Sequence, residues 1–134
     1  MSTLNSPSAA IYTKILFISL MLATYNVTAQ QEKQLVRLAK LVIDPAQLDT
    51  YNAMLKEEIQ ASVKIEPGVL TLYAVAEKKD PTHITILEIY ASTDAYQSHL
   101  KTPHFLKYKE GTKAMVKSIE LVETTPLIPD MKIK

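Results

Sequence analysis

The residues best suited to chemistry gather between Glu88 and Phe105, a stretch that holds two of the three histidines of the chain. His99 and His104 stand on either side of Pro103, where a helix must be interrupted. An imidazole takes and gives a proton near neutral pH, and a carboxylate in an apolar pocket becomes a stronger base. We therefore expect Glu88, His99 and His104 to be catalytic residues that move protons within one cavity.

Each of these side chains also has a structural interpretation. Glu88 can pair across the sheet with a basic residue such as Arg37 or Lys40. An inward-facing histidine such as His99, three residues after Tyr96 on the same helical face, is often a hydrogen-bonded part of the core. Both interpretations stay open for the sequence alone.

Aromatic residues in and near this stretch are the expected substrate-binding residues. A tyrosine offers an apolar ring with a hydroxyl donor, and small-molecule sites are mostly apolar with a few polar groups. The residues expected to contact a substrate are Tyr73, Tyr90, Tyr96 and Phe105. Tyr108 is interpreted as a core residue whose hydroxyl reaches the surface.

The composition excludes several kinds of site. With no Cys, the chain has no disulfide, no thiolate metal ligand and no Cys nucleophile. It has two Gly, too few to favour a loop that cradles phosphate. No P-loop, dinucleotide fingerprint, HExxH metal motif or nucleophile elbow is present.

The elements that must position these residues alternate between strands and helices. Runs of β-branched and aliphatic residues predict strands. Asp44-Pro45 begins the first helix, Glu66-Pro67-Gly68 ends it, and Thr102-Pro103 splits a second helical region. The predicted strands are 35–43, 69–77, 83–90 and 118–125, and the predicted helices are 45–65, 93–100 and 103–117.

This order, β-α-β-β-α-β, is that of the ferredoxin-like α+β fold, a four-stranded antiparallel sheet with helices on one face. The central strands are nevertheless apolar on both faces, since Leu87 and Ile89 oppose Ile84 and Ile86. An antiparallel sheet with one face in water should alternate apolar with polar residues. We therefore expect a second copy of the chain to cover the helix-free face, giving a homodimer.

The first 29 residues are predicted to be a cleaved export signal. Lys14 precedes an apolar core over residues 15–23, and Val27-Thr28-Ala29 places small or slim residues before Gln30, where a signal peptidase cuts. This apolar core is shorter than the ~20 residues that span a bilayer. We expect a mature domain of residues 30–134 that is periplasmic or secreted and not membrane-bound; the alternatives are an N-terminal anchor or a disordered leader.

The charge balance limits the partners. Because Lys14 is the only charged residue before Glu32, residues 30–134 carry equal numbers of acids and bases. A neutral domain lacks the basic footprint that nucleic acid or anionic lipid requires. A small molecule is the expected partner, and nucleic acid is not.

Several segments resemble the antibiotic biosynthesis monooxygenase family. They are Glu66-Pro67-Gly68-Val69-Leu70, Ile86-Leu87-Glu88-Ile89-Tyr90, Asp94-Ala95-Tyr96-Gln97-Ser98-His99-Leu100 and Thr102-Pro103-His104-Phe105. The resemblance covers residues 35–127 and implies a dimeric α+β barrel built from ferredoxin-like subunits. It also implies that Glu88, His99 and His104 match the acid and histidines that recur in the family.

Within that family, the chain is most similar to the quinol monooxygenases, and this similarity implies that no metal or flavin is needed. Haem-degrading relatives rely on a Trp, and this chain has none. The predicted export signal also departs from relatives that act in the cytoplasm.

The expected function is therefore a cofactor-independent monooxygenase that oxidises a quinol or polyphenol with dioxygen. An electron-rich phenolate can itself give an electron to dioxygen, so the protein has to deprotonate the substrate and keep it dry. Two alternatives remain: an isomerase or tautomerase that moves protons on a small carbonyl compound, and a non-catalytic dimeric module that binds a small ligand.

Overall fold

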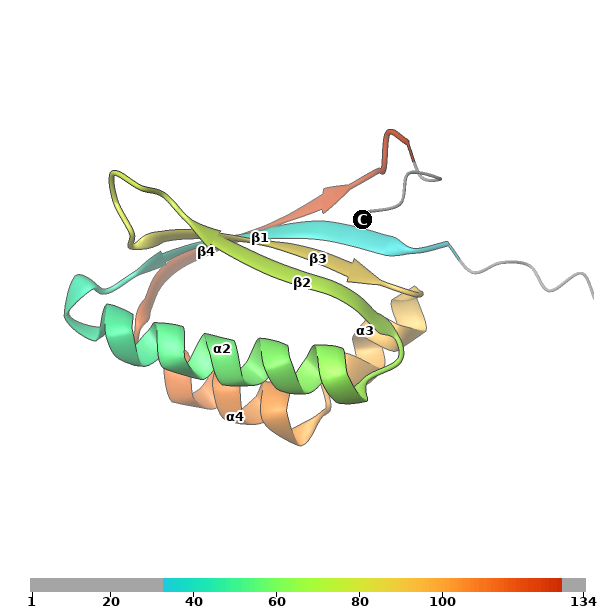
Figure 1. Ribbon diagram of the computed structural model, residues 1–134, viewed down its shortest axis with the longest axis horizontal. Coiled ribbons are helices and arrows are strands. Elements are labelled where there is room, and N and C mark those ends of the chain that lie inside the picture. Colours follow the sequence, from blue (N-terminus) through green and yellow to red (C-terminus); the bar gives the residue numbers. More distant parts are fainter. Residues whose placement is uncertain (1–32, 129–134) are drawn as a thin grey trace, which may run out of the picture. The chain divides into compact units, whose positions relative to one another are not determined.

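The computed structural model describes residues 33–128 (Figure 1). The predicted export signal, its cleavage before Gln30 and the last six residues lie outside the described residues. The elements in chain order are β1 (Leu35–Ile43), the 3-10 turn η1 (Pro45–Gln47), α2 (Leu48–Ile65), β2 (Val69–Ala76), β3 (His83–Tyr90), α3 (Thr93–His99), α4 (Pro103–Thr112) and β4 (Val116–Thr124).

The four strands form one antiparallel sheet in the order β2-β3-β1-β4. All three α-helices lie against the same face of this sheet, and α3 lies at one end of it (Figure 1). The predicted α+β, ferredoxin-like βαββαβ fold with helices on one face is confirmed. Within residues 33–128, none of the helices is long and apolar enough to cross a membrane.

Side-chain caps begin the helical segments where the sequence predicts them. The Asp44 carboxylate accepts a hydrogen bond from the backbone N–H of Ala46 at 3.0 Å and so starts η1. The Ser92 hydroxyl accepts from Ala95 N at 3.0 Å at the start of α3. Thr102 caps α4, with Pro103 in its first turn. The caps of Ser92 and Thr102 fix where α3 and α4 begin; His99 is the last residue of α3 and His104 lies in the first turn of α4.

The last helix and the last strand differ from the prediction. Helix α4 ends at Thr112, not near residue 117, and β4 begins at Val116. The end of β1 explains the difference, because Ile43 pairs with Val116 and the Asp44 N–H donates to the Met115 carbonyl at 2.8 Å. Pairing with β1 therefore takes residues that would otherwise extend the helix.

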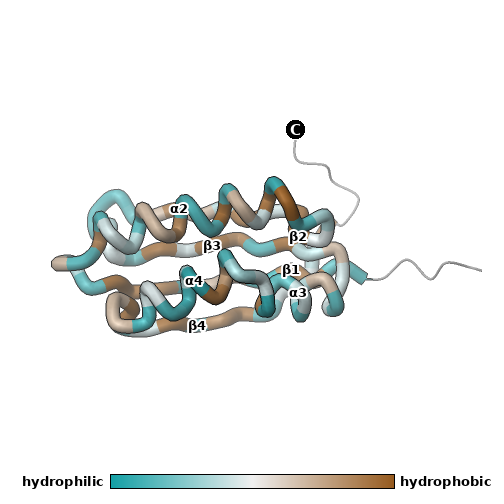
Figure 2. The backbone as a smooth tube through the Cα atoms, turned by 90° about the horizontal axis from the view of Figure 1, so that it is seen from below, coloured by the Kyte–Doolittle hydropathy of each residue, from teal (hydrophilic) through white to brown (hydrophobic). Residues whose placement is uncertain are grey.

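The hydrophobic core lies between the sheet and α2. Its buried residues are Ala39, Leu41, Ile43, Tyr51, Leu55, Ile84 and Ile86. In Figure 2 the strands are largely hydrophobic along their length, whereas α2 and α4 alternate between hydrophilic and hydrophobic residues. This alternation is expected of helices that bury one face only.

The helix-free face of the sheet is apolar, as the sequence predicts. Tyr73 and Val75 of β2 are 66% and 49% exposed, and Leu87 and Ile89 of β3 are half-buried. No helix among the described residues covers these side chains. The homodimer that would cover them stays a prediction.

Candidate functional site

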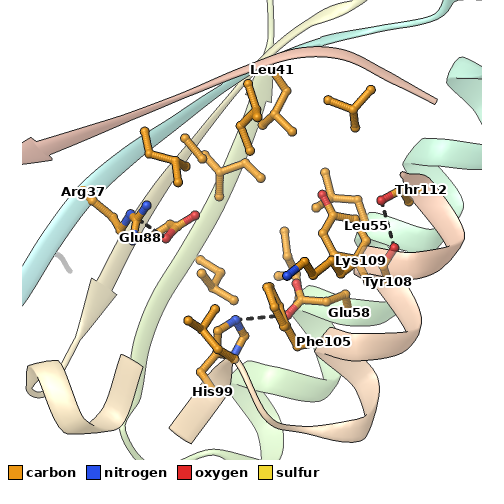
Figure 3. Close-up of a pocket in the computed structure, with 18 of the residues that line it drawn as sticks. Arg37, Leu41, Leu55, Glu58, Glu88, His99, Phe105, Tyr108, Lys109 and Thr112 are labelled. Carbon is orange, nitrogen blue, oxygen red and sulfur yellow. Dashed lines mark hydrogen bonds and ion pairs between the residues drawn. The ribbon is translucent and has the colours of Figure 1, made fainter. Parts of the chain in front are cut away.

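A cavity of about 670 Å³ lies between the sheet and the helices. Its walls include residues of β1, β3 and β4 on one side and of α2, α3 and α4 on the other (Figure 3). Ile119 and Leu121 of β4 line the cavity although each is more than half exposed. The cavity therefore opens to solvent along β4.

His99, the last residue of α3, is buried and lines this cavity. Its Nδ1 lies 3.0 Å from Oε1 and 3.3 Å from Oε2 of Glu66. Glu66 immediately follows α2, so the end of one helix holds the histidine at the end of another. A carboxylate on Nδ1 favours the tautomer with the proton there, which leaves Nε2 as the proton acceptor.

Glu66 also binds the second histidine. His104, in the first turn of α4, places its Nε2 2.5 Å from Glu66 Oε1. Burial acts to raise the pKa of the Glu66 carboxyl, but the hydrogen bonds with His104 and His99 outweigh it and hold the pKa below its usual value. Glu66 is therefore an ionised carboxylate shared by two imidazoles.

A second carboxylate, Glu58 of α2, faces the other ring nitrogen of His99. Glu58 Oε1 lies 3.7 Å from His99 Nε2 and accepts a hydrogen bond of 2.7 Å from the Ser62 hydroxyl. Burial raises the pKa of the Glu58 carboxyl, while the Ser62 hydrogen bond and the nearby His99 act in the opposite direction. The His99 ring therefore stands between the carboxylates of Glu66 and Glu58, and Figure 3 shows the Glu58 side of this arrangement.

Glu88 lines the cavity on its sheet side. It lies opposite Arg37 in the β1–β3 register, with Arg37 Nε 3.4 Å from Glu88 Oε2, and it accepts a hydrogen bond of 3.2 Å from the Tyr90 hydroxyl. Burial raises the pKa of the Glu88 carboxyl, and Arg37 and Tyr90 oppose that shift. Glu88 therefore borders the cavity and also makes the expected cross-strand pair with Arg37, and its catalytic role stays a prediction.

Aromatic rings surround His99. The Phe105 and Tyr90 ring centroids lie 4.7 Å and 5.4 Å from that of His99, and the Tyr96 ring packs against Tyr90 at 5.1 Å with a tilt of 59°. Tyr90, Tyr96 and Phe105 all line the cavity, as expected. Tyr108 lines it too, and its hydroxyl lies 2.7 Å from that of Tyr51, so it does not reach the surface.

Two expectations about the cavity are wrong. Tyr73 points to the helix-free face and is 66% exposed, so it does not line the cavity. After the register shift between Val69 and Thr71, alternation along β2 directs Leu72 to the cavity and Tyr73 away from it. His104 does not line the cavity either; its Nε2 binds Glu66, which in turn binds His99.

Sequence reasoning missed the two carboxylates that contact His99. Glu66 reads as the end of a helix, and nothing in its spacing relates it to a histidine 33 residues later. Glu58 carries a usable signal, because it follows Leu55 by three residues and Tyr51 by seven, on the inward stripe of α2. A charged residue at such a position is rarely buried without a partner.

Glu66, His99 and His104 also form a group with the donor types of a metal site. Their ligand atoms lie within 4.8 Å of one another, and two imidazoles with one carboxylate are ligands for divalent transition metals. In this structure the three side chains already satisfy one another by hydrogen bonds. A metal ion bound here would have to replace both the His99–Glu66 and the His104–Glu66 hydrogen bonds.

Comparison with known proteins shows which family this chain is similar to. The model of the antibiotic biosynthesis monooxygenase family matches residues 22–111. The crystal structure of a candidate antibiotic biosynthesis monooxygenase from Bacteroides thetaiotaomicron is 61% identical, has a TM-score of 0.75, and aligns over 76% of this chain and 97% of that one.

More distant structures share the fold. A candidate monooxygenase from Lactobacillus acidophilus is 30% identical with a TM-score of 0.69, and the match covers 71% of this chain and 45% of that one. A candidate antibiotic biosynthesis monooxygenase from Nitrosomonas europaea is 17% identical with a TM-score of 0.66, over 69% of this chain and 98% of that one. A search of curated proteins gave no match.

Proposed function

Since this chain belongs to the antibiotic biosynthesis monooxygenase family, we propose that it is a cofactor-independent monooxygenase that oxidises a quinol or related polyphenol with dioxygen. The observation that carries the proposal is the His99 imidazole, buried at an apolar cavity between the Glu66 and Glu58 carboxylates. Such a site can deprotonate a phenol without any metal.

His99 is the general base of this proposal. Glu66 holds the proton on Nδ1, so the lone pair of Nε2, which lies 3.7 Å from Glu58 and beyond hydrogen-bond distance, can take a proton from a phenolic hydroxyl in the cavity. The imidazolium that forms then lies between two carboxylates, which stabilise its charge in surroundings of low dielectric constant. His104 is a positioning residue, because it holds Glu66 in place and ionised.

The substrate supplies all the electrons. A quinol with one free ring position reacts with dioxygen to give a hydroxyquinone and water: one oxygen atom enters the ring, the other leaves as water with the two hydrogens that the quinol loses, and the four electrons come from the quinol. No further reductant is needed, so the protein's task is to form the phenolate and exclude water.

The cavity suits that task. Tyr90 and Tyr108 line it, and burial raises the pKa of both phenols, so their hydroxyls stay protonated and can donate hydrogen bonds. Leu41, Leu55 and Ile86 supply apolar wall. These residues favour an aromatic substrate over a charged one.

The direct test is oxygen consumption with reduced menadione as the substrate, corrected for the enzyme-free rate. His99→Gln should reduce the rate by about 10²–10⁴-fold, the usual contribution of a general base. His83→Gln is the matched control, because His83 pairs with Asp80 at the β2–β3 turn, away from the cavity. Equal rates in wild type and His99→Gln would refute the proposal.

Labelled dioxygen and a chelator complete the test. With ¹⁸O₂ the hydroxyquinone should carry one labelled oxygen, whereas a simple oxidase would release unlabelled quinone. Dialysis against EDTA should leave the rate unchanged. A rate that falls with EDTA and returns with a divalent metal would show that the reaction needs a metal, for which Glu66, His99 and His104 are the candidate ligands.

A proton-shuttling isomerase is the second candidate, and one observation favours it. Glu58 and Glu88, both with raised pKa values, border the same cavity, as an enzyme that takes a proton at one carbon and returns it at another would need. Such an enzyme turns over under argon, where the monooxygenase reaction stops. A protein that binds ligands but turns over under neither condition would be a binding module.

A further inference from the structure

Arg37 of β1 is a buried cation in the cavity wall. Arg37 lines the cavity and is 7% exposed. Among residues 33–128, its Nε is the one buried side-chain nitrogen or oxygen without a hydrogen-bond partner. Glu88 Oε2 lies 3.4 Å from it, within ion-pair distance but without hydrogen-bond geometry. A buried donor left without an acceptor is costly, so this N–H calls for an explanation.

The guanidinium is held in place from two sides. The Tyr96 ring lies under it, with 4.8 Å between Arg37 Cζ and the ring centroid. Glu88, its counter-ion, is held in turn by the Tyr90 hydroxyl. Arg37 is therefore a fixed donor and not a mobile surface charge.

Arg37 and Glu88 offer a hydrogen-bond donor beside an acceptor, on a different side of the cavity from the proposed base His99. In Figure 3 Arg37 and Glu88 lie on the sheet side of the cavity, while His99 and Glu58 lie on its helix side. The Tyr90 ring stands between the two groups, since it contacts His99 and its hydroxyl contacts Glu88. A ligand that crosses the cavity can touch both.

We propose that Arg37 and Glu88 form a second binding subsite, which selects aromatic substrates that carry a second hydroxyl across the ring system from the one that His99 deprotonates. This inference rests on the proposed function and names its substrate class. The second hydroxyl accepts from Arg37 Nε and donates to the Glu88 carboxylate, so it satisfies the unpaired N–H and uses both members of the pair.

Charge decides between a hydroxyl and a carboxylate as the group recognised. Arg37 and Glu88 already balance each other, so a substrate carboxylate would add an uncompensated negative charge to a largely apolar cavity. A neutral hydroxyl adds none. The cavity volume of about 670 Å³ lies within the range of sites for drug-sized ligands, which suits a fused-ring diol.

The test measures binding under argon, where no oxygen chemistry takes place. Titration calorimetry compares 1,4-dihydroxynaphthalene, 1-naphthol and 1-naphthoate. The wild type should bind the diol at least about tenfold more tightly than 1-naphthol, the value of one hydrogen bond to a charged group, and 1-naphthoate more weakly than either. Equal affinity for the diol and 1-naphthol, or tightest binding of the naphthoate, would overturn the proposal.

The variants remove the pair together, because a lone buried carboxylate could unfold the protein. In the double variant Arg37→Met, Glu88→Gln the preference for the diol should disappear while 1-naphthol affinity stays within about twofold. The matched control is Lys40→Met, Glu120→Gln, which removes an exposed cross-strand pair and should keep the preference. A preference that survives in the first double variant, with a wild-type-like melting curve, would refute the subsite.

Failure of the subsite and failure of the proposed function give different results. If the diol is preferred through Arg37 but no oxygen is consumed, the subsite stands and the monooxygenase reaction is rejected. If oxygen is consumed through His99 but the diol is not preferred, the reaction stands and the subsite is rejected.

Discussion

Glu66 and Glu58 lie on either side of the same imidazole, yet their carboxyl pKa values move in opposite directions. Glu66 is buried in part, but two histidines bind it and favour its charged form. Glu58 is more deeply buried and has one neutral hydroxyl as its hydrogen-bond donor, so burial outweighs the opposing contacts and raises the pKa of its carboxyl. This contrast gives each carboxylate its own pH signature.

Glu66→Gln should lower the melting temperature at neutral pH. Because the folded-state pKa of Glu66 is depressed, its contribution to stability is present above the ordinary value of 4.5 and is lost as the pH falls through the folded pKa. The gap between wild type and variant should therefore close below pH 4.5. Melting curves from pH 3 to pH 8 check this, and each kcal/mol corresponds to about 4–8 °C.

Glu58→Gln should have the opposite sign. The folded-state pKa of Glu58 is raised, so its contribution is present below 4.5 and is lost as the pH rises through the folded pKa. Glutamine resembles the uncharged carboxyl and can still bind the Ser62 hydroxyl, so the variant should melt above the wild type at pH 8. Parallel melting profiles for the two proteins at every pH would contradict the assignment.

How far the sequence predicts the site depends on the distance between partners along the chain. His99, Glu88, Tyr90, Tyr96 and Phe105 come from one short stretch, and all line the cavity. The two carboxylates beside His99 are 33 and 41 residues away, Glu66 just after α2 and Glu58 within it, and residue spacing carries no record of how α2 and α3 meet. The prediction that Glu88 is the acid beside the histidines was therefore incomplete, because Glu58 and Glu66 are the carboxylates that contact His99.

At the scale of elements, the turn between α2 and β2 positions α3 and therefore His99. The Gly68 carbonyl accepts from Ala91 N at 2.8 Å, and a Cβ built on Gly68 would lie 2.5 Å from the Cβ of Ala95. That contact is closer than two carbon atoms can approach, and neither Cβ can rotate away. Helix α3 can pack here only because residue 68 has no side chain.

Gly68→Ala should push α3 away from the turn, lower stability by about 1–3 kcal/mol, and reduce oxygen consumption because His99 moves with the helix. Gly111→Ala is the matched control. There the added methyl meets the flexible end of the Met54 side chain of α2, which can move aside, and alanine favours the helix by up to about 1 kcal/mol. If both variants melt and turn over alike, close packing at Gly68 does not position the histidine.

The strands were predictable because their residues are β-branched or aliphatic and their ends carry turn residues. Strands β1 and β3 lie where the sequence predicts them, and β2 ends one residue early. The end of α4 was not predictable, because residues 113–117 suit a helix by themselves and are taken by pairing with the distant end of β1. Local helix propensity does not predict the end of α4, because hydrogen bonds with the distant β1 determine it.

At the scale of the whole molecule, the apolar helix-free face predicts a homodimer. Tyr73→Asp should convert the dimer into a monomer that melts like the wild-type subunit, because Tyr73 is exposed within one chain and burying such a side chain contributes roughly 1.5–3 kcal/mol. Light scattering measures the mass. Leu106→Asp, at an exposed position on α4, should leave the dimer intact. A monomeric wild type would refute the arrangement.

The central place of β1 has a consequence for how the chain folds as it is made. Of the strands in residues 33–128, β1 leaves the ribosome first, yet it pairs with β3 and with β4, and the Thr124 hydroxyl donates to the Val36 carbonyl across 88 residues. Contacts of such sequence separation form late and slowly. A nascent chain that stops before Val116 should therefore keep one edge of β1 unpaired and sediment as aggregate. If β1 did not need β4, the truncated chain would instead remain as a smaller soluble domain.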